Sequence, residues 1–148
     1  MSNLRAEDPL AVKVVEAIHS GEIEALQRLL AENPGLASAR IVDAKRATCT
    51  LLHKAADWPG YFPNGARSVA LIAAAGGDAS APIMFLDSTK RDETPLHWAA
   101  SSDDVAVLDA LLDAGTGIEA PGGCIAGGTE LIQWLRGRGA KSAKELSA

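Results

Sequence analysis

The sequence predicts an all-α fold in which short helices stack in pairs around one continuous core. Hydrophobic residues make up 47% of the 148-residue chain but aromatic residues only 4%, so we expect a core of closely packed alanine and aliphatic side chains. Helix-start signals recur along the chain, and apolar residues follow them at helical spacing. The length suits a single domain spanning residues 1–148.

The clearest helix pair is predicted over residues 94–115. Thr94 can cap a first helix through its hydroxyl, and Pro95 suits the first helical position because an N–H there would lack a helical partner. Ser101 and Ser102 are expected to provide the cap of a second helix, with the carboxylates of Asp103 and Asp104 behind them. Gly115 is expected to end that helix.

The start of this helix pair has a counterpart upstream. Residues 94–100 read Thr-Pro-Leu-His-Trp-Ala-Ala, and residues 50–56 read Thr-Leu-Leu-His-Lys-Ala-Ala. This motif resembles the ankyrin repeat. The two threonines are 44 residues apart, about eleven more than the usual ankyrin period, so the earlier repeat is expanded.

The resemblance implies an all-α, ankyrin-repeat solenoid of about three and a half helix-turn-helix repeats with short finger loops. Its first repeat is divergent but has its own helix start at Asp8 and Pro9. Its last repeat lacks an inner helix and is interpreted as a partial cap. The predicted repeats are approximately 8–41, 46–83 (expanded), 90–122 and 123–148 (partial).

The motif histidines are interpreted as structural. In the ankyrin family the Thr and His of the motif form a hydrogen-bonded pair that joins neighbouring repeats, which implies pairs of Thr50 with His53 and of Thr94 with His97. The sequence holds no nucleophile-elbow, HExxH or P-loop pattern. We therefore expect no enzyme activity, no catalytic residue, no cofactor and no metal. The acidic run formed by Asp103, Asp104, Asp109 and Asp113 is interpreted as a solvated helix face.

Charge and hydropathy argue against two classes of binding partner, nucleic acids and membranes. The net charge of −5 argues against the basic face that nucleic acid requires. No apolar stretch approaches the length of a membrane span, and residues 1–10 lack the apolar core of a signal peptide. The sequence thus predicts a cytoplasmic protein with neither nucleic-acid nor membrane partners.

An insertion at residues 57–64 concentrates aromatic side chains. Trp58, Tyr61 and Phe62 are three of only six aromatic residues in the chain. Rigid aromatic side chains on a proline-braced loop are suited to anchoring a partner. The alternative is that the loop folds back and packs Trp58 and Phe62 into the local core. The sequence leaves both alternatives open.

The resemblance implies that a protein partner contacts the finger loops and the groove formed by the inner helices. Trp98 is the strongest single candidate, because it occupies the variable motif position that faces the groove in this family. It could instead stack on Trp58 or Lys54. The candidate partner-binding residues are Trp98, Lys54, Trp58, Tyr61, Phe62, Lys90, Arg91 and Asp92.

These observations predict a non-enzymatic protein-protein interaction scaffold. The alternative is a homodimerising module whose truncated C-terminal end forms the interface, because a missing inner helix would leave the preceding repeat poorly covered.

Overall fold

The protein has a mixed α/β fold, and the all-α prediction was therefore wrong. A computed structural model describes residues 3–87, 90–91, 93–117 and 137–139. Its longer elements are the helices α1 (Pro9–Ser20), α2 (Ile23–Glu32), α3 (Leu51–Ala55), α4 (Gly65–Ala74), α5 (Pro95–Ser101) and α6 (Val105–Asp113). Its shorter elements are the 3-10 helix η1 (Leu36–Ser38) and the strands β1 (Leu4–Arg5), β2 (Arg40–Val42), β3 (Ala47–Thr50), β4 (Ile83–Phe85) and β5 (Lys90–Arg91).

The strands form one five-stranded sheet in the order β1-β2-β3-β4-β5. Strands β1 and β2 are parallel, whereas each later pair is antiparallel. The segments expected to be finger loops are two β-hairpins, β2–β3 and β4–β5. Strands β3 and β4 pair with each other, with Thr48 opposite Met84, and so join the two hairpins into one sheet. Each strand is too short to give a clear periodic pattern, and the β3–β4 pairing joins residues far apart in the sequence. The sheet therefore depends on tertiary contacts that the local pattern did not reveal.

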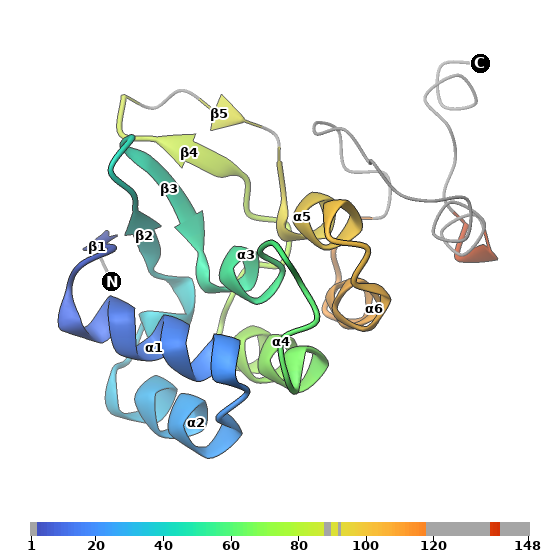
Figure 1. Cartoon of the computed structure of the whole chain (residues 1–148). Helices are drawn as coiled ribbons and strands as arrows, with labels where there is room; N and C mark the ends of the chain where they lie inside the picture. The colour runs from blue at the N-terminus through green and yellow to red at the C-terminus, as the bar shows by residue number, and fades with distance from the viewer. Residues whose placement is uncertain (1–2, 88–89, 92, 118–136, 140–148) are drawn as a thin grey trace.

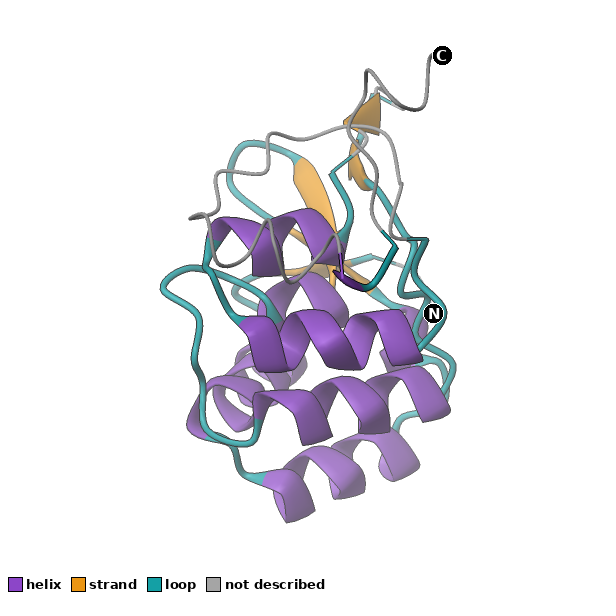
Figure 2. Cartoon of the chain, turned by 90° about the vertical axis from the view of Figure 1, so that its right-hand side faces the viewer, coloured by secondary structure: helices purple, strands orange, loops and turns teal. Residues whose placement is uncertain are grey.

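Within the described residues, helices α1 to α6 stack as three pairs, α1 with α2, α3 with α4, and α5 with α6 (Figure 1). Helices α1, α3 and α5 form one layer, and α2, α4 and α6 form a second layer beside it. Figure 2 shows these rows of helices lying nearly parallel. One hydrophobic core runs through all three pairs. Its largest fully buried aliphatic side chains are Ile18, Leu26, Leu36, Leu51, Leu52, Ile72, Leu108 and Leu111.

Most predicted helix boundaries are confirmed. Asp8 and Thr94 are the N-cap residues of α1 and α5, each followed by proline at the first helical position. Gly115 follows α6 with a left-handed φ of 96°. The predicted caps Ser101 and Ser102 were wrong, because the N-cap of α6 is Asp104, whose side chain accepts a hydrogen bond from Val107 N.

The partial repeat predicted at 123–148 lies outside the described residues apart from 137–139, and the count of three and a half repeats stays a prediction. None of the helices in the described ranges combines the length and apolar character needed to cross a bilayer.

Candidate partner-binding surface

The first motif pair, Thr50 with His53, links two helix pairs. Thr50 N donates to His53 Nδ1 at 3.2 Å, and Thr50 Oγ1 lies 2.9 Å from the same nitrogen. An Nδ1 that accepts a hydrogen bond leaves the proton on Nε2, which donates to the carbonyl oxygen of Glu93 at 3.1 Å. Burial is the main cause that lowers the pKa of His53 from 6.5 to about 4. The ring is therefore a neutral structural link between α3 and the residue preceding Thr94.

The second motif pair, Thr94 with His97, repeats the same geometry. Thr94 N donates to His97 Nδ1 at 3.0 Å, and both residues are buried. The two predicted Thr–His pairs are thus confirmed. Sequence reasoning missed a related link, in which His19 Nε2 lies 2.9 Å from the carbonyl oxygen of Lys54. His19 lies at the end of the first inner helix, and that position was its only sequence signal.

Trp98 projects from α5 toward the preceding helix pair. Its indole meets the His53 ring edge-on, with centroids 5.0 Å apart and an interplanar angle of 76°. Its Nε1 donates to Glu93 Oε2 at 3.4 Å. The alternative that Trp98 stacks on Trp58 or Lys54 was wrong, because the neighbour it contacts is the motif histidine. The indole is therefore half-buried and held from two sides.

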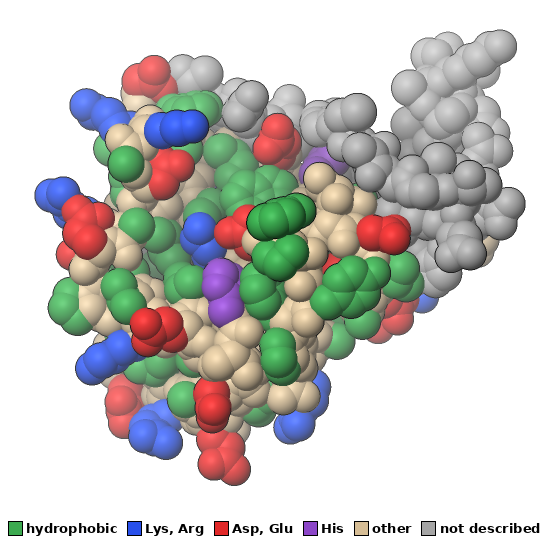
Figure 3. Space-filling view, in the orientation of Figure 1, with side chains coloured by type: hydrophobic (Ala, Val, Ile, Leu, Met, Phe, Trp, Pro, Cys, Tyr) green, Lys and Arg blue, Asp and Glu red, His purple; other side chains and the backbone are tan. Residues whose placement is uncertain are grey.

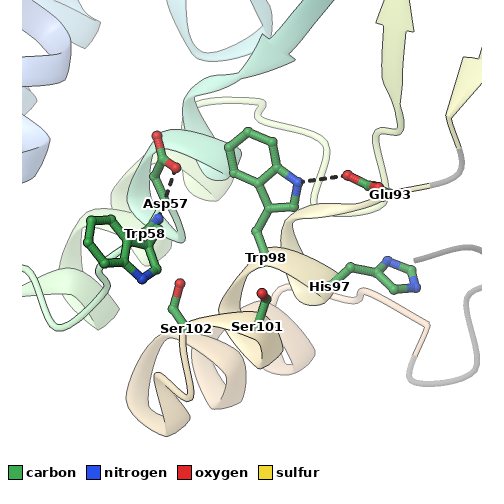
Figure 4. Close-up of a pocket in the computed structure, with 7 residues that line it drawn as sticks. All are labelled: Asp57, Trp58, Glu93, His97, Trp98, Ser101 and Ser102. Carbon is green, nitrogen blue, oxygen red and sulfur yellow. Dashed lines mark hydrogen bonds between the residues drawn. The ribbon is translucent and has the colours of Figure 1, made fainter. Parts of the chain in front are cut away.

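Two hollows meet at Trp98 and Glu93, which line both. The first, the tryptophan hollow, has a volume of about 350 Å³ and is drawn in Figure 4. It is lined by Asp57, Trp58, Glu93, His97, Trp98, Ser101 and Ser102. The second, the sheet hollow, has a volume of about 260 Å³ and is lined by Ala6, Ile41, Asp43, Lys45, Ala47, Cys49, Lys54, Ile83, Phe85, Glu93 and Trp98. In Figure 3 hydrophobic side chains gather on this face among charged ones.

Five residues that line the tryptophan hollow are not among the candidate partner-binding residues, namely Asp57, Glu93, His97, Ser101 and Ser102, of which His97 was predicted only as a structural residue. A signal for one of them was present, since Ser101 is three positions after Trp98 and thus shares its helix face. Asp57 and Ser102 come from turns that only the fold brings together.

The aromatic insertion combines the two alternatives that the sequence left open. Phe62 packs inward by stacking on His19, with ring centroids 4.1 Å apart and planes 13° apart. Trp58 and Tyr61 instead remain 79% and 67% exposed. The alternative in which Trp58 packs into the core with Phe62 was wrong for Trp58, and the loop has one half-buried and one exposed aromatic side.

The backbone of the insertion is held by the turns on both sides of it. Tyr61 N donates to Asp104 Oδ2 at 2.7 Å, and the Tyr61 hydroxyl donates to the carbonyl oxygen of Asp103. Toward the N-terminus, Asn64 Nδ2 donates to the carbonyl oxygen of Gly21 at 3.0 Å. The exposed aromatic rings are thus carried on an anchored backbone.

The remaining predicted site residues fall in three places. Lys54 lines the sheet hollow, and its Nζ lies 3.6 Å from Asp57 Oδ2. Lys90 and Arg91 form β5, although their side chains are not among those described, and Asp92 lies outside the described residues. Of the predicted surface, the tryptophan hollow therefore brings together Trp98 and Trp58, whereas Lys54 borders the neighbouring hollow.

The acidic run does not form a uniformly solvated face, so that interpretation was wrong in part. Asp104 is only 1% exposed and serves as an N-cap. Asp109 and Asp113 each lie within ion-pair distance of Arg138, at 2.5 and 3.6 Å. Across the described residues, no cluster of three His, Cys, Asp or Glu side chains could hold a metal ion.

Comparison with known protein families agrees with this geometry in one part of the chain. Residues 91–120 match the ankyrin repeat. This match covers α5 and α6 and confirms the resemblance drawn from the Thr94 motif. No curated protein matches the sequence. An ankyrin repeat indicates a protein-binding module and nothing more specific.

Proposed function

We propose that the chain is a non-enzymatic protein-binding scaffold whose contact surface is centred on Trp98, Trp58 and Tyr61. The observation that carries this proposal is the pair of exposed aromatic rings on the anchored 57–64 loop beside the tryptophan hollow. Trp58 and Tyr61 are the most exposed large hydrophobic side chains in the described ranges. Rigid aromatic side chains bury a large area on binding at low entropic cost, which makes them frequent energetic centres of interfaces.

The architecture supports the same proposal. Hydrogen bonds from the Tyr61 backbone N–H and the Asn64 side chain tie the 57–64 loop to the turns on both sides, so little ordering cost is expected when a partner binds. Trp98 is fixed by the His53 ring and Glu93. The homodimer alternative rests on residues 123–148, which lie outside the described part apart from 137–139.

The proposal can be tested by affinity capture from native lysate, identification of the captured protein, and measurement of its binding to purified variants. Trp58→Ala and Trp98→Ala are each expected to weaken binding by more than about tenfold, as interface anchors do. Val12→Ala is the matched control, because Val12 is an exposed apolar residue, 39% exposed, on α1. Circular dichroism should show that each variant is folded. Equal affinity of all three variants would contradict the proposed surface.

A further inference from the structure

We propose that the tryptophan hollow binds a cationic side chain, a lysine or an arginine, of the protein partner. This inference rests on the proposed function, because it names the chemistry that the surface recognises. Its basis is the combination of two indole rings and two carboxylates around one hollow. The faces of indole rings attract ammonium and guanidinium groups, and tryptophan is the most effective aromatic side chain in this respect.

The two rings reach the hollow from different parts of the fold. Trp58 lies on the loop between α3 and α4, and Trp98 lies on α5. In the view of Figure 4, the carboxylate of Asp57 lies above Trp58 and beside Trp98, and Glu93 lies on the side of Trp98 away from Trp58. A cation entering the hollow would therefore meet aromatic and anionic groups together.

The charges that line the hollow have one sign. Asp57 and Glu93 are its acidic residues, and the described lining includes neither lysine nor arginine. Lys54 does contact Asp57 Oδ2 at 3.6 Å, but it lines the sheet hollow instead. The indole N–H of Trp98 orients Glu93 beside the ring. The net charge of −5 would add a long-range attraction for a basic partner.

The size of the hollow fits a single long side chain. Its volume of about 350 Å³ is at the low end of ligand pockets, which run from roughly 300 to 1,000 Å³. The apolar stem of lysine or arginine can lie along aromatic surface while its charged end meets carboxylates. An acidic residue would be repelled by Asp57 and Glu93, and an apolar residue would remove water from them without replacing its hydrogen bonds. A side chain with an apolar stem and a cationic end can contact both the aromatic surface and the carboxylates.

The test uses the full-length, nitrogen-15-labelled protein and short blocked peptides. One peptide carries a central arginine between glycines, and a matched peptide carries citrulline, which has nearly the same shape without the charge. A lysine peptide and its acetyl-lysine counterpart form a second pair. The indole signals of Trp58 and Trp98, assigned with Trp58→Phe and Trp98→Phe, report on the hollow.

We expect the arginine and lysine peptides to shift both indole signals saturably, and their neutral counterparts to bind about tenfold more weakly. Glu93→Gln should weaken the arginine peptide about threefold to fivefold, because one anionic contact is lost. Glu24→Gln removes the same charge from the exposed surface of α2 and should leave binding unchanged. Both carboxylate variants preserve the indole rings, so the test does not depend on truncating Trp98.

Three results would overturn the inference: equal affinity for arginine and citrulline, no shift of either indole signal, or the same affinity in Glu93→Gln as in Glu24→Gln. These outcomes are separate from failure of the proposed function. If a captured partner requires Trp58 but neither basic peptide binds, the cation site is wrong and the partner surface stands. If the basic peptides bind but the partner tolerates Trp58→Ala, the cation site stands and the partner surface is wrong.

Discussion

The α3/α4 and α5/α6 helix pairs begin in the same way but connect their helices differently. Thr50 and Thr94 each form a capping box with the histidine three residues later. The α5/α6 pair turns through residues 102–104, whereas the α3/α4 pair uses the longer segment 56–64. The shared motif therefore sets how an inner helix starts, and the connection that follows it is free to vary.

The longer connection also touches the turns of both neighbouring pairs. It reaches the α5/α6 turn through Tyr61 and Asp104, and the α1/α2 turn through Asn64 and Gly21. Gly21 has a φ of +72°, and a Cβ there would lie 2.4 Å from the carbonyl oxygen of Pro63. The insertion thus stabilises the stack on one side and displays Trp58 and Tyr61 on the other. In the shorter α5/α6 turn, Asp104 caps α6 and also accepts the hydrogen bond from Tyr61 N.

The motif histidines offer the largest test of this comparison. His53 is neutral in the folded protein because its pKa is about 4, but it takes up a proton near pH 6.5 when the chain unfolds. Its contribution to stability is therefore complete above pH 6.5 and is lost as the pH falls toward 4. The expected loss in the free energy of unfolding is about 3 kcal/mol.

Urea unfolding of the unchanged protein and of His53→Gln at several pH values between 7 and 4 measures this loss. Carboxylates titrate in both proteins, so the difference between their unfolding free energies isolates His53. That difference should shrink as the pH falls. His97→Gln alters the equivalent position of the other pair while retaining His53, and it should keep the pH-dependent loss. A constant difference between the unchanged protein and His53→Gln would refute the neutral-histidine assignment.

The turn aspartates offer the second test. Asp104 is buried, caps α6 and accepts a hydrogen bond from Tyr61 N, so Asp104→Ala removes a cap and leaves the N–H groups of Val107 and Tyr61 without this acceptor. We expect a loss of about 2 to 3 kcal/mol in the free energy of unfolding. Asp57→Ala in the longer connection should cost less than about 1 kcal/mol, because its contacts to Lys54 and Trp58 N are partly solvated. Chemical denaturation of both variants measures these free energies of unfolding. Equal losses in the two variants would show that the two turns contribute equally to stability.

The two sides of the insertion offer the third and smallest test. Phe62→Ala removes the stack on His19 and should lower the free energy of unfolding by about 1 to 2 kcal/mol. Trp58→Ala should leave it within about 0.5 kcal/mol of the original value, because Trp58 is 79% exposed. Thermal melts monitored by circular dichroism provide the measurement. A Trp58→Ala loss as large as that of Phe62→Ala would mean that the loop is not divided into a buried and an exposed side.

Much of the helical framework could be predicted because its signals are local. A threonine cap, a proline at the first helical position and apolar residues at helical spacing act within a few neighbouring residues, as Thr94 and Pro95 illustrate. The Thr–His pairs, which the resemblance to the ankyrin repeat implied, are also local, since their members lie three positions apart. Trp98 was named as a candidate from its place in the motif, and Trp58 because three of the six aromatic residues of the chain lie in one insertion.

The cap of α6 shows where local reasoning failed. The sequence pattern placed the cap at Ser101 and Ser102, with Asp103 and Asp104 behind them, although serine and aspartate are both favourable cap residues. Asp104 takes the role because its buried carboxylate also accepts the Tyr61 N–H from a segment over 40 residues earlier. That second hydrogen bond exists only after the insertion has folded against the turn.

The sequence by itself determined where the inner helices begin, which threonines and histidines pair, and which aromatic residues are candidates for binding. Only the tertiary structure decided that the finger segments form a sheet, that Phe62 packs inward while Trp58 stays exposed, and that Asp57 and Glu93 share one hollow with two tryptophans. The physical reason is the separation in sequence of the residues that interact. Capping and helical spacing act between near neighbours, whereas strand pairing, ring stacking and the lining of a hollow involve residues that come together only when the chain folds.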